Sequence, residues 1–434
     1  MAAAAVLSAV SLPPPPETPA FIATPAARPP PGQPDIQYHP DWHKYQARAA
    51  RRAKLDNLPK TVPEGFPTEL KGDLVWEGET LAETYDWTYV LSAQQLEEID
   101  HALAHFRSLN LPLGHVSADT FPLPTLRPEL RRLSRELHSG HGFFVLRGLQ
   151  VDRYSREDNI IIYTGVSSHV AAIRGRQDSR YQGREADVVV THIKDLTVSD
   201  PGKKGDIGSP AYTADKQVFH TDAGNIISLF ALSTAADGGA SRLASTWRVY
   251  NHLAATRPDL IHTLSESWDV ENFAKAQGDQ DRFISRPLLY HQPATDSAPE
   301  RIVLQYARRY FVGFGALPRS ADIPPITEAQ ADALDALHFL GERFSVSTNF
   351  EKGDIQYVNN TGIFHARDGF TDTPEKQRHL LRLWLRDPEH SWETPAALED
   401  RWRAVYGGVT PERQVFPLEP YIRSESNKEA ATKS

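Results

Sequence analysis

Two histidines and an aspartate supply the residue types from which this chain could build a metal site. His220 and Asp222 stand two positions apart. Residues i and i+2 of a β-strand point to the same side of a sheet, so both side chains could bind one ion. The spacing alone is a weak signal, because His39 and Asp41 repeat it in a proline-rich stretch where we expect no metal role. An ordinary hydrogen-bonded pair remains the alternative for His220 and Asp222.

A third candidate ligand, His365, follows an apolar run and an Asn-Asn-Thr-Gly turn at residues 359–362. The chain contains no cysteine, so any metal must be held by His, Asp or Glu. Two histidines and one carboxylate form the facial triad of non-haem iron sites, which leaves neighbouring coordination positions open. A hydrogen-bonded core histidine is the alternative for His365.

Two arginines interrupt the apolar run that follows. Arg378 and Arg382 lie four positions apart, which places them on one face of a strand predicted over residues 378–385. A guanidinium group is rarely buried without an anion, and its fork matches a carboxylate. The pair therefore predicts one or two bound anions inside the sheet. Solvated arginines on an exposed face are the alternative, which the flanking leucines and Trp384 disfavour.

Together these residues resemble the TauD/TfdA family of iron(II)/2-oxoglutarate-dependent dioxygenases, which is related to gamma-butyrobetaine hydroxylase and clavaminate synthase. The resemblance covers roughly residues 140–390. It rests on Gly142–Gly148, His220-Thr-Asp222, Gly238–Ser241, Asn359-Asn360 before His365, and Arg378–Arg382. The sequence departs from the family pattern in its long N-terminal stretch and in residues 170–215, which leaves the substrate open.

The resemblance implies that His220, Asp222 and His365 hold iron(II), with 2-oxoglutarate and O2 as cosubstrates. The implied reaction is the oxidation of a small, anionic or amino-acid-derived molecule by hydroxylation, desaturation or cyclisation, with release of succinate and CO2. Asp222 argues against a halogenase, because related halogenases lack that carboxylate.

The resemblance also implies roles around the metal. Arg378 would pair with the far carboxylate of 2-oxoglutarate, and Ser241 would touch the same group. Arg382 is similar to the arginine that meets the anionic group of the substrate in taurine-type members. From the residues themselves, Asn225, three positions past Asp222, and Arg308 or its neighbour Arg309 are further candidates for the substrate pocket. A turn role for Asn225 and a surface salt bridge for the arginines are the alternatives.

The elements that would position these residues are helical first and rich in strands afterwards. Capping boxes, Ser92 with Gln95 and Thr327 with Gln330, predict two helices, the second ending at Gly341. Strands are predicted at residues 142–148, 226–232, 302–312, 355–358 and 378–385. This order favours a mostly β fold with flanking helices, built on a double-stranded β-helix (jelly-roll) core.

Composition limits the possible partners. The chain has 434 residues and a net charge of −9, which argues against nucleic-acid binding. No apolar run approaches the roughly 20 residues that span a bilayer. We expect a cytoplasmic protein with a small-molecule substrate and no membrane partner; a weak N-terminal targeting peptide is the alternative, and the oligomeric state stays open.

The domain organisation expected from composition has three parts. Residues 1–60 are expected to form a disordered Ala/Pro-rich tail and connector that includes a basic, helical stretch at residues 44–54. Residues 61–425 are expected to form one catalytic domain, and 426–434 a flexible tail. Two other functions fit parts of the pattern: a jelly-roll metal-dependent hydrolase or isomerase, and a non-catalytic binding protein of the same fold. A hydrolase has no general need for two buried arginines after the third ligand, and a binding protein has no need to keep all three ligands.

Overall fold

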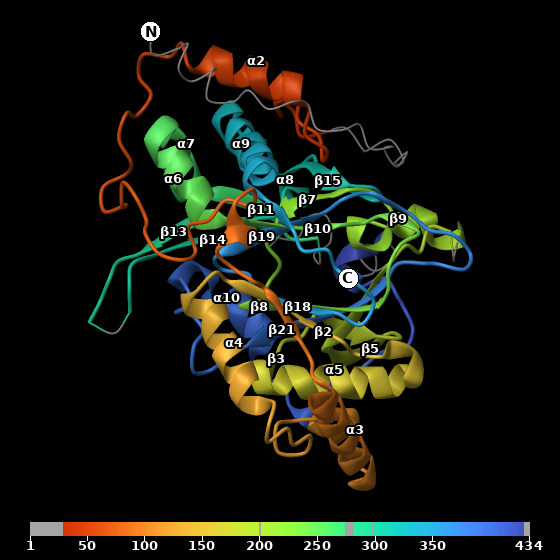
Figure 1. Cartoon of the computed structure of the whole chain (residues 1–434). Coiled ribbons are helices and arrows are strands. Elements are labelled where there is room, and N and C mark those ends of the chain that lie inside the picture. The colour runs from red at the N-terminus through yellow and green to blue at the C-terminus, as the bar shows by residue number, and fades with distance from the viewer. Residues whose placement is uncertain (1–28, 199–200, 274–281, 297, 429–434) are drawn as a thin grey trace.

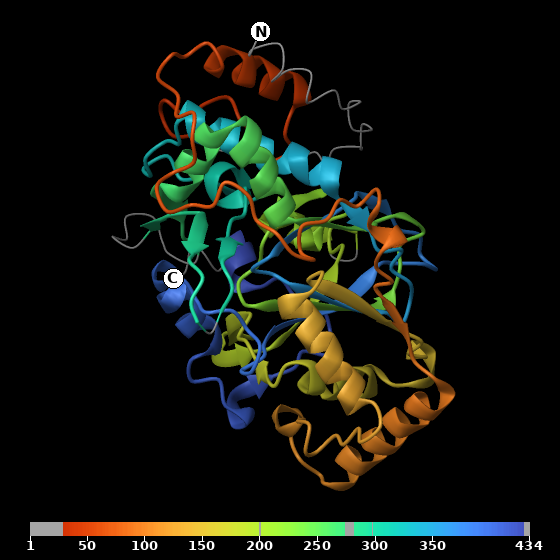
Figure 2. The same ribbon diagram turned by 60° about the vertical axis from the view of Figure 1, so that its left-hand side comes forward.

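A computed structural model describes residues 29–198, 201–273, 282–296 and 298–428 of the chain. Two β-sheets lie one above the other, and helices cover their outer sides (Figure 1 and Figure 2). The helices on one side are α2 (Trp42–Arg52), α6 (Thr246–Thr256), α7 (Pro258–Ser265) and α9 (Glu328–Phe344). Those on the other side are α3 (Ala93–Ser108), α4 (Arg127–Ser139) and α5 (Arg156–Val170). The prediction of a mostly β fold with flanking helices is confirmed.

The larger sheet has seven strands in the order β1-β2-β18-β8-β21-β3, and β6 also pairs with β21. Its strands are β1 (Thr88–Val90), β2 (Phe143–Arg147), β18 (Ile355–Asn359), β8 (Ile226–Ser233), β21 (His379–Arg386), β3 (Ile173–Arg174) and β6 (Val190–Lys194). All pairs are antiparallel except β1 with β2.

The smaller sheet has four antiparallel strands in the order β17-β10-β19-β7. They are β17 (Val346–Ser347), β10 (Ser241–Ser245), β19 (Ile363–Arg367) and β7 (Gln217–His220). Shorter pairings join β4 (Asp178–Tyr181), β5 (Arg184–Val188), β9 (Asp237–Gly238), β11 (Trp268–Glu271), β12 (Phe283–Arg286), β13 (Leu289–Gln292), β14 (Arg301–Leu304), β15 (Gly313–Phe314), β16 (Leu317–Pro318), β20 (Phe370–Thr371) and β22 (Gln414–Val415). Two further helices, α8 (Arg309–Val312) and α10 (Glu399–Tyr406), lie outside these sheets.

The alternation of side chains along β21 separates a dry face from a polar one. Leu381, Leu383 and Leu385 belong to the apolar cluster that packs α3, α4 and α5 on the larger sheet. Arg382 and Trp384 point to the opposite face, toward the smaller sheet. The period of two in a strand therefore directs a charged group into the space between the sheets.

Both predicted capping boxes are present, at the starts of α3 and α9. Helix α9 does not end at Gly341 as predicted, but continues to Phe344. A Cβ atom at Gly341 would lie 2.7 Å from the ring of Phe219 on β7. Gly341 therefore brings α9 close to the smaller sheet rather than ending the helix.

The expected tail over residues 1–60 is wrong for its second half, while residues 1–28 lie outside the described residues. Helix α2 packs on α9, where the rings of Trp42 and Tyr45 lie 4.8 and 5.1 Å from that of Phe339. Buried Arg48 pairs with Asp335. The charged surface of α2 hid this apolar stripe. Of the expected C-terminal tail, residues 426–428 are described, and Ser426 is buried.

Two strand predictions also need correction. The run 302–312 is a strand only at β14 and then turns into α8. Strand β21 begins at His379, so Arg378 lies just before it. Within the described part of the chain, no helix is both long and apolar enough to cross a membrane.

The buried carboxylate of Asp335 anchors the N-terminal segment by pairing with Arg48 of α2. This ion pair allows a prediction about stability. Asp335 pairs with Arg48 and, at 2.7 Å, with Arg308, and all three side chains are buried. Asp335→Asn should lower the free energy of unfolding by about 3–5 kcal/mol, because it leaves buried Arg308 without a counter-charge and buried Arg48 with only the exposed Glu328. Chemical denaturation measures the loss. The control Glu328→Gln removes an exposed partner of Arg48 and should change stability by less than about 1 kcal/mol. Equal effects of the two variants would refute the anchor.

Candidate metal centre and its pocket

Strand pairing in the smaller sheet brings the two candidate histidine ligands together. His365 on β19 lies directly opposite His220 on β7. Their ring centroids are 4.2 Å apart. The ladder is irregular after this pair, where the register shifts before Arg367 meets Gln217. The antiparallel register thus joins two residues that are far apart in sequence.

Asp222 reaches the histidines from beyond the strand rather than from within it. Strand β7 ends at His220, which corrects the expectation that both residues share a strand. The backbone N–H of Asp222 donates to the Asn360 side chain at 2.9 Å, and the Asn360 amide donates to the carbonyl of Asp222 at 2.7 Å. Next to it, the N–H of Thr221 donates to the carbonyl of Tyr306 at 2.8 Å. These bonds fix the position of Thr221 and Asp222, which lie beyond the end of strand β7.

The two oxygens of Asp222 have different neighbours. Oδ2 accepts hydrogen bonds from Arg382 at 2.7 Å and from the indole N–H of Trp384 at 3.1 Å. Oδ1 faces Nε2 of His220 at 3.7 Å. Arg382 is itself fixed by its Nε, which donates to Gln177 at 2.8 Å. One oxygen is therefore held by the protein, while the other remains directed at the histidines.

The protonation states suit a metal. Burial, with the neighbouring His220, lowers the pKa of His365 to about 3, and burial also lowers the pKa of His220. Burial alone would raise the pKa of Asp222, but Arg382 and then the two histidines outweigh it and hold the pKa well below its usual range. At neutral pH the site therefore presents two neutral imidazoles and a carboxylate, the forms that bind metal ions.

The donor atoms also fit one ion. One ligand atom from each of His220, Asp222 and His365 lies within 4.8 Å of the others. Nδ1 of His220 donates to the carbonyl of Val218 at 2.9 Å, and Nε2 accepts from the amide of Gln217 at 3.0 Å. Nε2 therefore bears the lone pair. Nδ1 of His365 is buried without a hydrogen-bond partner among the described residues. Two imidazoles and one carboxylate are a donor set for non-haem iron(II).

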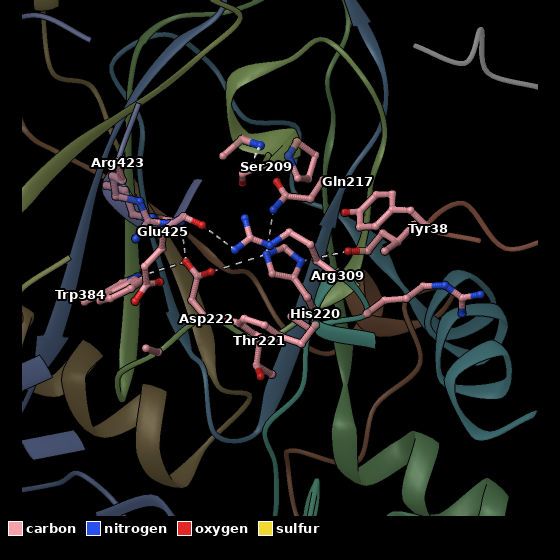
Figure 3. Close-up of a pocket in the computed structure, with 18 of the residues that line it drawn as sticks. Tyr38, Ser209, Gln217, His220, Thr221, Asp222, Arg309, Trp384, Arg423 and Glu425 are labelled. Atoms are coloured by element: carbon pink, nitrogen blue, oxygen red, sulfur yellow. Dashed lines mark hydrogen bonds and ion pairs between the residues drawn. The ribbon is translucent and has the colours of Figure 1, made fainter. Parts of the chain in front are cut away.

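A cavity opens beside this cluster, and its wall is rich in arginine. His220, Asp222 and Gln217 point toward one another, and Trp384, Arg423 and Glu425 lie on the Asp222 side (Figure 3). We call the following four lining residues the arginine group: Arg309, Arg382, Arg401 and Arg423. Besides Asp222, the exposed Glu425 is the acidic residue in the lining. The cavity is therefore suited to a negatively charged molecule.

Arg378 and Ser241 lie outside the residues that line this cavity. The guanidinium of Arg378 is buried over the ring of Phe370 at 5.5 Å, and its Nη1 has no partner among the described residues. Burial and nearby Arg367 lower the pKa of Arg378. Gly239 makes room for the Arg378 side chain, since a Cβ atom at Gly239 would lie 3.1 Å from that side chain. The hydroxyl of Ser241 donates to Gln356 at 2.9 Å.

The structure gives Asn225 and Arg308 other partners than a substrate. The side-chain oxygen of Asn225 accepts from the indole of Trp402 at 3.0 Å, and Asn225 is not in the cavity lining. Arg308 borders the cavity, but its guanidinium is paired with Asp335. Its neighbour Arg309 points to the metal side instead and donates to the carbonyl of Glu425 at 3.0 Å (Figure 3).

Sequence reasoning missed three parts of the wall. Tyr38 comes from the expected tail, Arg401 from α10, and Arg423 from the C-terminal segment. Arg401 and Arg423 could have been noticed because arginines recur in the sequence after β21. We had assigned that stretch only to the end of the domain. Tyr38 has no local pattern that marks it.

Known proteins are similar to this chain over most of its length. The family model described as "Taurine catabolism dioxygenase TauD, TfdA family" matches residues 108–384. The taurine hydroxylase-like protein SAT17 of Stachybotrys chartarum is 36% identical over 88% of this chain and 95% of its own length. FR-33289 synthase of Streptomyces rubellomurinus is 24% identical over 76% of this chain and 94% of its own length.

Solved structures share the fold at low sequence identity. Asparagine oxygenase in complex with Fe(II), 3-hydroxyasparagine and succinate superposes with a TM-score of 0.50 at 17% identity, over 71% of this chain and 98% of that one. The non-heme iron oxygenase OrfP with a hydroxyarginine gives 0.51 at 14% identity, over 76% and 99%. Since the family model spans more than half of the sequence and the Stachybotrys relative matches along most of it, the chain belongs to the TauD/TfdA family of dioxygenases.

Proposed function

We propose that this chain oxidises a small, anionic or amino-acid-derived molecule as an iron(II)- and 2-oxoglutarate-dependent dioxygenase, with release of succinate and CO2. The observation that carries the proposal is the convergence of His220, Asp222 and His365 beside a cavity. Solved relatives that contain Fe(II) with succinate, and Fe with alpha-ketoglutaric acid, support the same cofactors here. We further propose that the two sheets form a double-stranded β-helix, with residues 29–428 as one catalytic domain.

In this proposal His220, Asp222 and His365 hold the metal, and the residues around them fix the orientation of the ligand atoms. Nε2 of His220 and Oδ1 of Asp222 lie 3.7 Å apart and would hold the ion together with His365, while Arg382 and Trp384 donate to Oδ2. A facial triad would leave neighbouring coordination positions open for the cosubstrate and dioxygen. Iron(II) with 2-oxoglutarate supplies the activation of dioxygen, coupled to oxidative decarboxylation of the cosubstrate.

Arg378 is the candidate for the far carboxylate of 2-oxoglutarate. A buried guanidinium without an anion is costly, and Nη1 of Arg378 has no partner among the described residues. A carboxylate would supply the missing charge and hydrogen bonds. Ser241 could join this contact only by giving up its bond to Gln356. Arg382 has a buried free Nη2, which we propose meets the anionic substrate while Nη1 holds Asp222.

The metal site makes the first prediction of this function. His220→Ala, Asp222→Ala and His365→Ala should each abolish tight iron(II) binding and 2-oxoglutarate-dependent succinate release, because each removes one of three ligands. Anaerobic iron titration and a succinate assay measure the two effects. The control His101→Ala changes an exposed histidine of α3 and should leave both unchanged. A folded His365→Ala protein with full activity would show that His365 is not a metal ligand.

The second prediction concerns Arg378, the proposed cosubstrate arginine. Arg378→Leu should raise the KM for 2-oxoglutarate by about tenfold or more, since a charged hydrogen-bond pair is lost. Arg378→Lys should restore only part of the affinity, because an ammonium cannot form the fork. Arg386→Leu, at the far end of β21, is the matched control. An unchanged KM in Arg378→Leu would remove Arg378 from the cosubstrate site.

Arg382 provides a third test, because the structure connects it to both ligands. Arg382→Met should weaken iron(II) binding, since Asp222 loses its charged partner, and should also weaken binding of the anionic substrate. Iron titration in the absence of substrate isolates the first effect. Unaltered iron affinity would show that the pair with Asp222 does not tune the metal site.

A further inference from the structure

The arginine group contains more positive charge than the residues around it neutralise. Arg382 forms an ion pair with Asp222. No carboxylate of a described residue lies within ion-pairing distance of Arg309, Arg401 or Arg423. Their known partners are neutral: Arg309 donates to two backbone carbonyls, Arg401 to the hydroxyl of Tyr310 at 3.3 Å, and Arg423 to the carbonyl of Gln177 at 2.9 Å.

Arg401 and Arg423 also keep free donors. Nε of each is buried and has no hydrogen-bond partner among the described residues. Arg423 is more than nine-tenths buried, with 8% of its surface exposed. Its guanidinium stands 5.4 Å from the ring centre of Trp384, and that of Arg382 stands 5.1 Å from the same ring. The ring of Trp384 therefore makes cation–π contacts with two guanidinium groups, and it lies on the side of the cavity next to Asp222 (Figure 3).

These arginines are not explained by the metal and the cosubstrate. Arg378 lies outside the cavity lining, and the proposed function assigns it to the far carboxylate of 2-oxoglutarate. Arg382 has one free nitrogen, which a singly charged substrate could satisfy. Arg401 and Arg423 then remain with buried Nε donors that have no hydrogen-bond partner among the described residues, and an unpaired buried donor is costly. Glu425 and Asp222 act on both guanidinium groups only from beyond ion-pairing distance. A second negative charge on the substrate would satisfy both.

We propose that Arg401 and Arg423 form an additional oxyanion site, and that the substrate carries two negative charges, either on one phosphoryl-type group or on two carboxylates. The inference rests on the proposed function and narrows its substrate class. Arg401 comes from α10 and Arg423 from the C-terminal segment, so the end of the chain determines substrate charge. Arg309 adds to the field, and its Nη1 and Nη2 donate to backbone carbonyls.

Two acids of one shape and different charge test the proposal. Methylphosphonate, at a pH where it is doubly charged, and methanesulfonate, which is singly charged, are titrated anaerobically by calorimetry into the protein saturated with iron(II) and 2-oxoglutarate. Malonate and acetate provide the same comparison for carboxylates. We expect at least one doubly charged acid to bind about tenfold or more tightly than its singly charged counterpart. Which of the two does so identifies the phosphoryl or dicarboxylate class. Equal affinities within both pairs would overturn the proposal.

Variants locate the effect. Arg401→Gln and Arg423→Gln should each weaken binding of the preferred doubly charged acid by about tenfold, because one charged donor is lost. Arg423→Lys should recover part of it. Arg403→Gln is the matched control, since Arg403 is exposed on the same helix and pairs with Asp400. An equal loss in Arg403→Gln would indicate a general field and refute the site.

Two checks keep the outcomes separate. Thermal midpoints identify any variant that fails to fold, and the half-buried Arg401 decides the question if Arg423→Gln does not fold. Slow succinate formation by the unmodified protein without substrate reports on the proposed function itself. Its absence would refute the dioxygenase, whereas its presence with no charge preference would refute only the second oxyanion site.

Discussion

A carboxylate can be buried only where cations and hydrogen-bond donors replace the water that it has lost. Asp222 meets this condition through Arg382 and Trp384, which donate to one carboxylate oxygen, while Asn360 holds the main chain of Asp222. The same contacts leave the other oxygen facing His220. The geometry of the candidate metal centre therefore depends on how this one charge is held.

The frame around that charge is built from close packing in the smaller sheet. The register of β19 on β7 sets His365 against His220, and Gly341 lets α9 approach Phe219 behind them. The N-terminal helix α2 then closes over α9 through the buried pair of Arg48 and Asp335. Segments from both ends of the described chain thus support a site that lies in its middle.

The arginine group gives the cavity its chemical character. Its members come from α8, β21, α10 and the C-terminal segment, and one of them serves Asp222. The others donate hydrogen bonds to neutral groups. The four arginines share the cavity wall with two acidic residues, Asp222 and Glu425, so positive charge is in excess there even though the whole chain has a net charge of −9. Local charge near the metal, rather than overall charge, is the property that selects a ligand here.

Much of this site could be predicted from sequence, because its signals are local. The pair His220 and Asp222, the two capping boxes and the arginine-containing run of β21 each depend on residues within a few positions of one another, and His365 is marked by the Asn-Asn-Thr-Gly turn shortly before it. Only the tertiary structure decided that Asp222 lies past the end of its strand, that Arg308 turns away while Arg309 turns in, and that Arg401 and Arg423 complete the wall. Those outcomes depend on contacts between segments far apart in the chain, where packing and the need to pair buried charge determine side-chain direction, and no local periodicity records them.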